Sequence, residues 1–361
     1  MKWVVRVLGL VTLLVIVVAG LGFGYRAWRQ HENAIAFTIA TPNGVQEASF
    51  VRIGGIDQWI STRGEDRANP VVLFLHGGPG NSILPLEPVF HAWESHFTMV
   101  QWDQRGAGKT YGRNGTNEQP MTVERIVQDG IEVAEYLRGH LEKSKIVLLG
   151  HSWGTEIGMQ MVIARPDLFS AYVGTGQVVS IREKEAYIYA DALRRLRAAG
   201  DSDGIRALEQ IGQPPYRNNH DLEVQRHWSE HYDIPAERDL RAHFTPMVAF
   251  APDFSLRDIY DLLYASEWTA QELFADEAEF DARVCCTSFQ VPVFVFNGDH
   301  DTITPTELVQ PWFDMLQAPS KGLVIMEDAG HSAVLAEPEV FLDLLLRDVR
   351  PVAVAWSRDQ P

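Results

Sequence analysis

The residues with the clearest chemical potential in this sequence are Gly150-His151-Ser152-Trp153-Gly154, a Gly-x-Ser-x-Gly motif. The preceding residues 145–149 have the apolar, β-branched character of a buried parallel strand, and the pattern from Thr155 onward is helical. A serine between a strand and a helix, with glycine on both sides, is the nucleophile elbow pattern, because bulk at either glycine would collide with the neighbouring elements. We therefore expect Ser152 to project as a nucleophile at the carboxyl end of a sheet.

Candidate partners for Ser152 follow two late apolar runs. Residues 291–296 lead to Asp299 and Asp301, and residues 322–326 lead to His331. A carboxylate that orients a histidine, which takes the proton of a serine, makes that serine nucleophilic. The order Ser, Asp, His along the chain is one of three known orders of such triads.

Two further loops follow strand-like runs. Residues 71–75 lead into His76-Gly77-Gly78-Pro79-Gly80, where glycines let backbone N–H groups approach a substrate closely, as an oxyanion hole requires. Residues 97–100 lead into a loop that ends in Gly108-Lys109-Thr110. A phosphate-binding loop needs a glycine five residues before Gly108, where this chain has Asp103, so the cradle for phosphates is incomplete and the pattern argues against nucleotide binding there.

The loops 76–80 and 102–106 (Trp-Asp-Gln-Arg-Gly) together with the serine motif resemble the α/β-hydrolase superfamily, and in particular the proline iminopeptidases of serine peptidase family S33. The resemblance implies that Ser152 attacks the substrate carbonyl and that His331 transfers the proton. The family spacing Gly-x-x-Asp from Gly298 selects Asp301 as the acid that orients His331, so Asp299 is expected to shape the turn.

The same resemblance assigns the oxyanion donors and the cofactor requirement. The backbone N–H groups of Trp153 and Gly78 are the expected donors, with Gly77 as the alternative. This chemistry needs neither a metal nor an organic cofactor. A serine at the elbow also argues against dehalogenases and epoxide hydrolases, which carry aspartate there.

The resemblance implies removal of an amino-terminal proline or similar residue from short peptides, with acidic side chains that pair with the substrate ammonium. The family's Trp-x-x-Trp-Glu segment is absent from this sequence, and Glu230, Glu267 and Glu272 are the available substitutes. A carboxylesterase or lipase-like acyl hydrolase is the alternative function. A non-catalytic binding protein of the same fold is the third.

The pattern along the chain predicts an α/β-hydrolase fold, a mostly parallel sheet flanked by helices with an inserted helical cap. Residues 35–62 predict antiparallel strands around Phe37–Ile39, 50–53 and 56–60, and residues 123–137 predict a helix before the serine strand. Residues 180–288 are helix-like and charged, and core-type strands return after them. We therefore divide the chain into an amino-terminal segment (1–30), a core (31–179 and 289–361) and a cap (180–288).

The amino terminus carries an uncharged apolar run at residues 7–23, between Lys2 and Arg6 on one side and Arg26 and Arg29 on the other. Its length is close to the ~20 residues that cross a bilayer and exceeds a typical signal-peptide core. We predict an uncleaved transmembrane signal anchor with the catalytic domain outside the cytoplasm. The alternative is a secreted or periplasmic protein, cleaved near Val17-Val18-Ala19.

Composition limits the partners. The formal net charge of −17 argues against nucleic acid, and 46% hydrophobic residues in a chain of 361 allow a large core. The only cysteines, Cys285 and Cys286, are adjacent, and we expect ordinary buried thiols because adjacent cysteines rarely bridge. Short peptides or small molecules and a membrane are the expected partners, and the sequence leaves the oligomeric state open.

Overall fold

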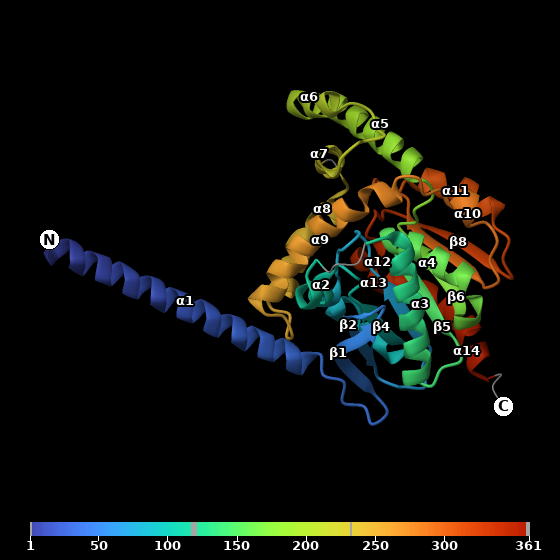
Figure 1. The fold of residues 1–361 in the computed structure, drawn as a ribbon, viewed down its shortest axis with the longest axis horizontal. Coiled ribbons are helices and arrows are strands. Elements are labelled where there is room, and N and C mark those ends of the chain that lie inside the picture. The colour runs from blue at the N-terminus through green and yellow to red at the C-terminus, as the bar shows by residue number, and fades with distance from the viewer. Residues whose placement is uncertain (1, 117–120, 232, 359–361) are drawn as a thin grey trace.

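The fold is built on one twisted sheet with helices on both faces (Figure 1). The structure is a computed structural model that describes residues 2–116, 121–231 and 233–358. Within these residues eight strands lie in the order β1-β2-β4-β3-β5-β6-β7-β8. The strands are β1 (Val45–Ile53), β2 (Ile56–Gly64), β3 (Val71–Leu75), β4 (Thr98–Trp102), β5 (Ile146–His151), β6 (Phe169–Thr175), β7 (Val293–Gly298) and β8 (Lys321–Met326).

The sheet is mostly parallel. β1 pairs with β2, and β2 with β4, in antiparallel register, while every pairing from β4 across to β8 is parallel. Parallel strands need crossover connections, and helices fill them. The helices of the core are α2 (Gly108–Asn114), α3 (Val123–His140), α4 (Trp153–Ala164), α11 (Thr306–Met315), α12 (Ala333–Ala336), α13 (Pro338–Leu344) and α14 (Arg350–Arg358), with 3₁₀ turns η1 (Leu84–Ser95) and η2 (Pro166–Leu168) and a π turn η3 (Leu345–Val349).

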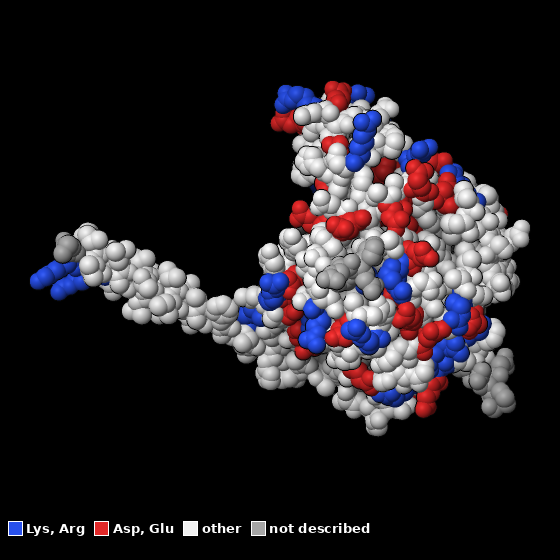
Figure 2. Space-filling model, viewed as in Figure 1, with Lys and Arg blue, Asp and Glu red and all other residues white. Residues whose placement is uncertain are grey.

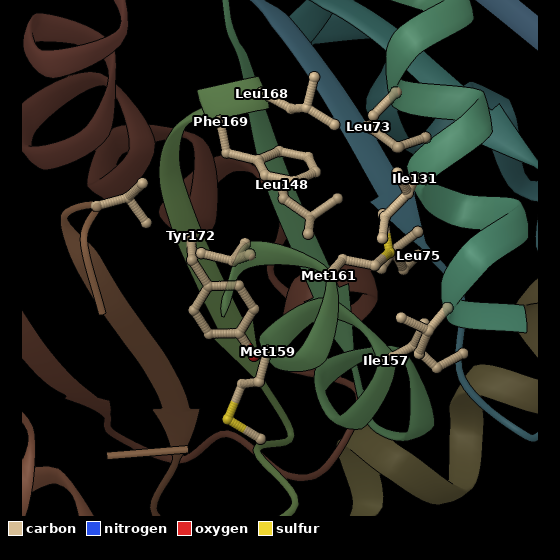
Figure 3. Packing of buried hydrophobic residues seen from close by; sticks show 14 of the residues in the cluster. Leu73, Leu75, Ile131, Leu148, Ile157, Met159, Met161, Leu168, Phe169 and Tyr172 are labelled. Atoms are coloured by element: carbon tan, nitrogen blue, oxygen red, sulfur yellow. The ribbon is translucent and has the colours of Figure 1, made fainter. Parts of the chain in front are cut away.

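Alternate residues of the central strands face two separate hydrophobic clusters. In β3 and β5, Leu73 and Leu148 pack in the cluster that includes α3 and α4, while Val72 and Val147 pack in the cluster that includes η1 and α13. Figure 3 shows Leu148 among side chains of α4. Burial on both faces explains why these strands are continuous apolar runs in the sequence.

Helices without an intervening strand occupy the chain between β6 and β7 in the described residues. They are α5 (Ile181–Ala199), α6 (Ser202–Ile211), α7 (Asn219–Glu230), α8 (Pro235–Ala249), α9 (Leu256–Glu277) and α10 (Ala282–Cys285). The two ends of this segment meet, since Ser180 forms an antiparallel bridge with Asp281. We propose that this segment is the inserted cap.

The amino-terminal helix α1 (Lys2–Ala36) extends away from the rest of the molecule (Figure 1). None of its residues is buried. The prediction of a strand around Phe37 and Ile39 is wrong, because α1 continues to Ala36 and the first strand begins only at Val45. The prediction of two antiparallel strands on either side of Gly54-Gly55 is confirmed.

The cysteine prediction is also wrong. Cys285 and Cys286 form a disulfide with each other, and Cys285 is exposed. Proximity along the chain brings the two sulfurs together at the end of α10.

Candidate active site

Ser152 lies in the turn between β5 and α4, with φ 54° and ψ −123°. This region is unfavourable for a residue with a side chain, so neighbouring contacts must hold the turn. A Cβ on Gly150 would lie 2.4 Å from the carbonyl oxygen of Gly154, and a Cβ on Gly154 would lie 2.2 Å from that of Leu75. Both glycines are therefore required sterically, as the motif predicts.

His331 connects Ser152 to Asp301. Its Nε2 lies 3.0 Å from Ser152 Oγ, and its Nδ1 lies 3.1 Å from both carboxylate oxygens of Asp301. Asp301 also accepts hydrogen bonds from the N–H groups of Ile303 and Thr304 and from the Thr304 hydroxyl. The three side chains come from the loops after β5, β7 and β8, so the parallel sheet brings them to one edge.

The charges of this group favour an ion pair. Burial alone would lower the pKa of His331, but the charge and hydrogen bonds of Asp301 outweigh burial and raise the pKa above its ordinary value. Burial likewise opposes ionisation of Asp301, yet the charge of His331 and hydrogen bonds leave the pKa of that carboxyl below its usual range. The pair is therefore arranged to stabilise an imidazolium next to a carboxylate.

Asp299, the other candidate acid, contacts groups outside the triad. Asp299 accepts hydrogen bonds from the ring of His300 and from the N–H of Ala329. Burial and the charge of His331 lower the pKa of His151 to about 3, and burial lowers the pKa of His76 to about 4. These two rings are neutral at physiological pH.

The predicted oxyanion donors lie on either side of the serine turn. Trp153 is the first residue of α4, and the first N–H groups of a helix have no acceptor within it. The loop that carries Gly77 and Gly78 follows β3, which pairs with β5 at Leu75 and Gly150. Gly77 lies against Ser152, because a Cβ on Gly77 would be 3.0 Å from the Cβ of Ser152.

A cavity of about 1080 Å³ opens beside His331, between the core and the cap. Its lining includes three carboxylates, Glu230, Asp233 and Glu237. Its remaining walls are largely apolar and come mainly from α8 and α9: Leu240, Phe244, Val248, Ile259, Leu262 and Leu263, together with Ile303 and Leu335.

The structure separates the three predicted substrate glutamates. Glu230 lines this cavity, whereas Glu267 and Glu272 are exposed on α9 and do not belong to its lining. Sequence reasoning missed Glu237, which is half-buried and accepts a hydrogen bond of 2.7 Å from the N–H of Ser332. Its sequence context resembles that of the other charges of the cap, so no local signal identifies it.

Lys109 contacts protein groups in place of a phosphate. Its ammonium lies 4.3 Å from the ring centre of Trp59 and donates a hydrogen bond to the carbonyl of Asp253. The side chain of Asp103 accepts the N–H of Lys109 itself. Across the described part of the chain, no group of three or more His, Cys, Asp or Glu side chains is placed to hold a metal ion.

Comparison with known proteins agrees with this architecture. The alpha/beta hydrolase fold family matches residues 70–338. A probable aminopeptidase YbaC of Bacillus subtilis (strain 168) is 30% identical over 304 residues, which cover 82% of this chain and 94% of that protein. A proline iminopeptidase of Arabidopsis thaliana is 26% identical over 306 residues, covering 81% of this chain and 76% of that protein.

Solved structures share the fold. A proline iminopeptidase-related protein of Thermus thermophilus superposes with a TM-score of 0.60 at 19% identity, over 85% of this chain and 99% of that one. A bacterial membrane phospholipase A superposes with a TM-score of 0.55 at 15% identity, over the whole of both chains. The chain therefore belongs to the alpha/beta hydrolase fold family, and its relatives include proline iminopeptidases and a probable aminopeptidase.

Proposed function

We propose that this protein is a serine hydrolase that removes amino-terminal residues from short peptides through an acyl-enzyme. The observation that carries the proposal is the chain of contacts from Ser152 Oγ to His331 Nε2 (3.0 Å) and from His331 Nδ1 to Asp301 (3.1 Å). A serine, a base and a group that orients the base are what covalent acyl transfer requires.

In the first half of the reaction, Ser152 Oγ attacks the substrate carbonyl carbon while His331 Nε2 takes the hydroxyl proton. Asp301 stabilises the imidazolium that forms. The N–H groups of Trp153 and Gly78, or of Gly77, hold the oxyanion. The imidazolium then gives its proton to the leaving amine, the carbon–nitrogen bond breaks, and the acyl group remains on Ser152.

In the second half, water enters in place of the amine. His331 takes a proton from the water, whose oxygen attacks the acyl carbon, and the same donors stabilise the second oxyanion. Collapse of this intermediate returns the proton to Ser152 Oγ. The enzyme is regenerated and the acyl product leaves as an acid.

Selection for a free amino terminus is supported by the carboxylates of the cavity. Glu237, Asp233 and Glu230 all line the space beside His331. Burial raises the pKa values of Glu237 and Asp233, because it disfavours the charged carboxylates. The positive charge of a substrate ammonium would stabilise these carboxylates. The names of the relatives point in the same direction.

Hydrolysis of acyl esters is the second candidate. The apolar side of the same cavity favours it, because Leu240, Phe244, Val248 and Leu262 offer apolar contacts to an acyl chain.

We also propose that α1 anchors the enzyme in a membrane, with the catalytic domain outside the cytoplasm. The most apolar stretch of α1 has a mean hydropathy of 2.7, and none of it is buried. Basic residues flank this stretch at both ends, and Trp3, Tyr25 and Trp28 are exposed where an aromatic belt would lie. A cleaved signal is the alternative for this segment.

The function is tested by turnover of the purified full chain on a proline arylamide with a free amino terminus and on a short-chain acyl ester. Preference for the arylamide that is lost on blocking the amino group supports the aminopeptidase, and preference for the ester supports the second candidate. Ser152→Ala is the control in both assays. No turnover of either substrate by folded wild-type protein would contradict a hydrolase and favour a binding protein.

A further inference from the structure

The turn between α8 and α9, residues 250–255, is fastened to α1. Arg26 of α1 donates hydrogen bonds to the carbonyls of Ala249 (3.0 Å) and Phe254 (2.6 Å), and Gln30 donates to that of Ala251 (2.6 Å). Carbonyls in the last turn of a helix, such as that of Ala249, have no partner within the helix and are free to accept these bonds. The α8–α9 hairpin (residues 235–277) is thereby held at a fixed place along α1.

Lys109 contacts the same turn. Its ammonium lies 4.7 Å from the ring centre of Phe254 and bonds the carbonyl of Asp253, as described above. The turn therefore links α1 to the catalytic core. In Figure 1, α1 leaves the body of the protein beside the end of α9 that carries this turn.

The first turns of α9 expose large apolar side chains next to this junction. Leu256, Tyr260 and Tyr264 are 52%, 55% and 46% exposed. Their spacing of four places them on one face of the helix. Neighbouring side chains of α9, Ile259 and Leu262, line the cavity beside His331. One helix thus offers apolar groups both to the solvent and to the cavity.

The position of Arg26 sets the level of this face relative to a bilayer. A helix rises about 1.5 Å per residue, so the apolar residues 7–25 span roughly the 30 Å of a hydrocarbon core. Arg26 then lies at its boundary, and the turn bonded to Arg26 lies at headgroup depth. Leu256 and Tyr260 follow that turn within about two helical turns.

The charges in the first turns of α9 are compatible with this depth. Asp258 forms a capping box with Ser255 at the amino terminus of α9, where a helix stabilises negative charge. Arg257 is paired with Asp261 at 2.8 Å. Figure 2 shows the projecting part of α1 white, with basic groups at its free end and where it meets the body.

We propose that the α8–α9 hairpin rests in the membrane interface, with Leu256 and Tyr260 in contact with lipid, so that the cavity beside His331 takes amphiphilic substrates from the bilayer surface. The inference rests on the proposed membrane anchor and on the second candidate function, the hydrolysis of acyl esters, for which it names the source of the substrate.

Lipid contact is tested directly by photo-crosslinking in the full chain. Benzoylphenylalanine is placed at Tyr260 and, as the control, at Val284, which is 86% exposed on α10. In Figure 1, α10 lies on the opposite side of the molecule from α1. After reconstitution into vesicles of radiolabelled phosphatidylcholine and illumination, we expect at least ten times more lipid adduct at position 260 than at 284.

The outcomes separate the two proposals. If an alkaline carbonate wash removes the chain from membranes, the anchor is wrong and the inference fails with it. If the chain is retained but position 260 yields no more adduct than position 284, the anchor stands and the interfacial hairpin is overturned.

The consequence for substrates is tested with Leu256→Asp, which lies outside the cavity lining, and with Val284→Asp as the control. In vesicles, Leu256→Asp should lower turnover of a bilayer-embedded acyl ester about tenfold, because the variant loses the contact of one leucine side chain with lipid. Turnover of a water-soluble short-chain ester should be unchanged. An equal loss on both esters, or a loss on neither, contradicts the inference.

Discussion

Glu237 accepts a hydrogen bond of 2.7 Å from the backbone N–H of Ser332, the residue after His331. The contact joins α8 to the loop that holds the candidate base. Burial raises the pKa of Glu237, and the negative charge of Glu237 in turn helps to raise the pKa of His331. The cap segment thus influences the protonation of His331 directly.

This coupling predicts a pH effect. His331 acts as a base only when neutral, so kcat/KM should rise with pH through a midpoint above the ordinary histidine value. Glu237→Gln removes a negative charge, which lowers the pKa of His331 and moves the midpoint to lower pH. The pH profile of kcat/KM measures the shift, with Glu272→Gln, an exposed change on α9, as the control. A midpoint that stays in place or moves upward would contradict the coupling.

The contacts of Ser152 predict its mutational profile. Ser152→Ala should lower kcat by on the order of 10⁶-fold, and Asp301→Asn by about 10⁴-fold, because the amide leaves His331 in the wrong tautomer. Active-site titration and steady-state kinetics measure both losses, and thermal melting verifies the fold. Ser288→Ala, at an exposed serine, should retain full activity. Retained turnover in well-folded Ser152→Ala protein would refute the assignment.

The close approach at Gly154 predicts a loss of both stability and activity. In Gly154→Ala the new Cβ would meet backbone oxygens of Leu75 and His76, which cannot rotate away. We expect a destabilisation of about 1–3 kcal/mol and displacement of Ser152 from His331. Gly139→Ala is the matched control, because nothing lies within 4 Å of its added Cβ in α3 and alanine favours a helix. Denaturant unfolding measures the stability of both variants, and steady-state kinetics measures their kcat. Equal stabilities would show that the backbone around Ser152 shifts to accommodate the added methyl group.

The sequence predicted what depends on local pattern. The runs at β3 and β5 are apolar throughout because both faces of those strands are buried, and the glycines around Ser152 reflect the steric limits of one turn. Asp301 follows β7 and His331 follows β8. Because these parallel strands are neighbours, the two residues, 30 apart in sequence, meet at the carboxyl ends of the strands.

Contacts made across the chain could not be predicted. Glu237 meets Ser332 over a separation of 95 residues, and Arg26 meets Phe254 over 228, each through side chains that resemble ordinary surface charges in the sequence. The end of α1 at Ala36 is likewise not visible in the local pattern. Residues 35–39 alternate like a strand, but the long helix that precedes them continues through Ala36, because extending a formed helix is easier than starting one.

Arg105 of the Trp-Asp-Gln-Arg-Gly loop forms a buried ion pair with Asp129 of α3. Its Nε lies 2.7 Å from Asp129 Oδ2, both side chains are almost fully buried, and its Nη2 donates to the carbonyl of Gly54. Asp129 also pairs with Arg125 at 2.8 Å. The loop is thereby tied to α3 and to the turn between β1 and β2.

Removing one member of such a pair leaves the other charge buried without compensation. Asp129→Asn should therefore lower the free energy of unfolding by about 3–5 kcal/mol, whereas the exposed pairs of Asp57 with Arg52 and Arg113 predict a loss of about 1 kcal/mol or less for Asp57→Asn. Urea unfolding of the detergent-solubilised chain, followed by tryptophan fluorescence, measures the free energy of unfolding of both variants. The two values are comparable when the m-values are equal. A loss in Asp129→Asn no larger than in Asp57→Asn would mean that water reaches Arg105, and that the loop is held by its backbone contacts alone.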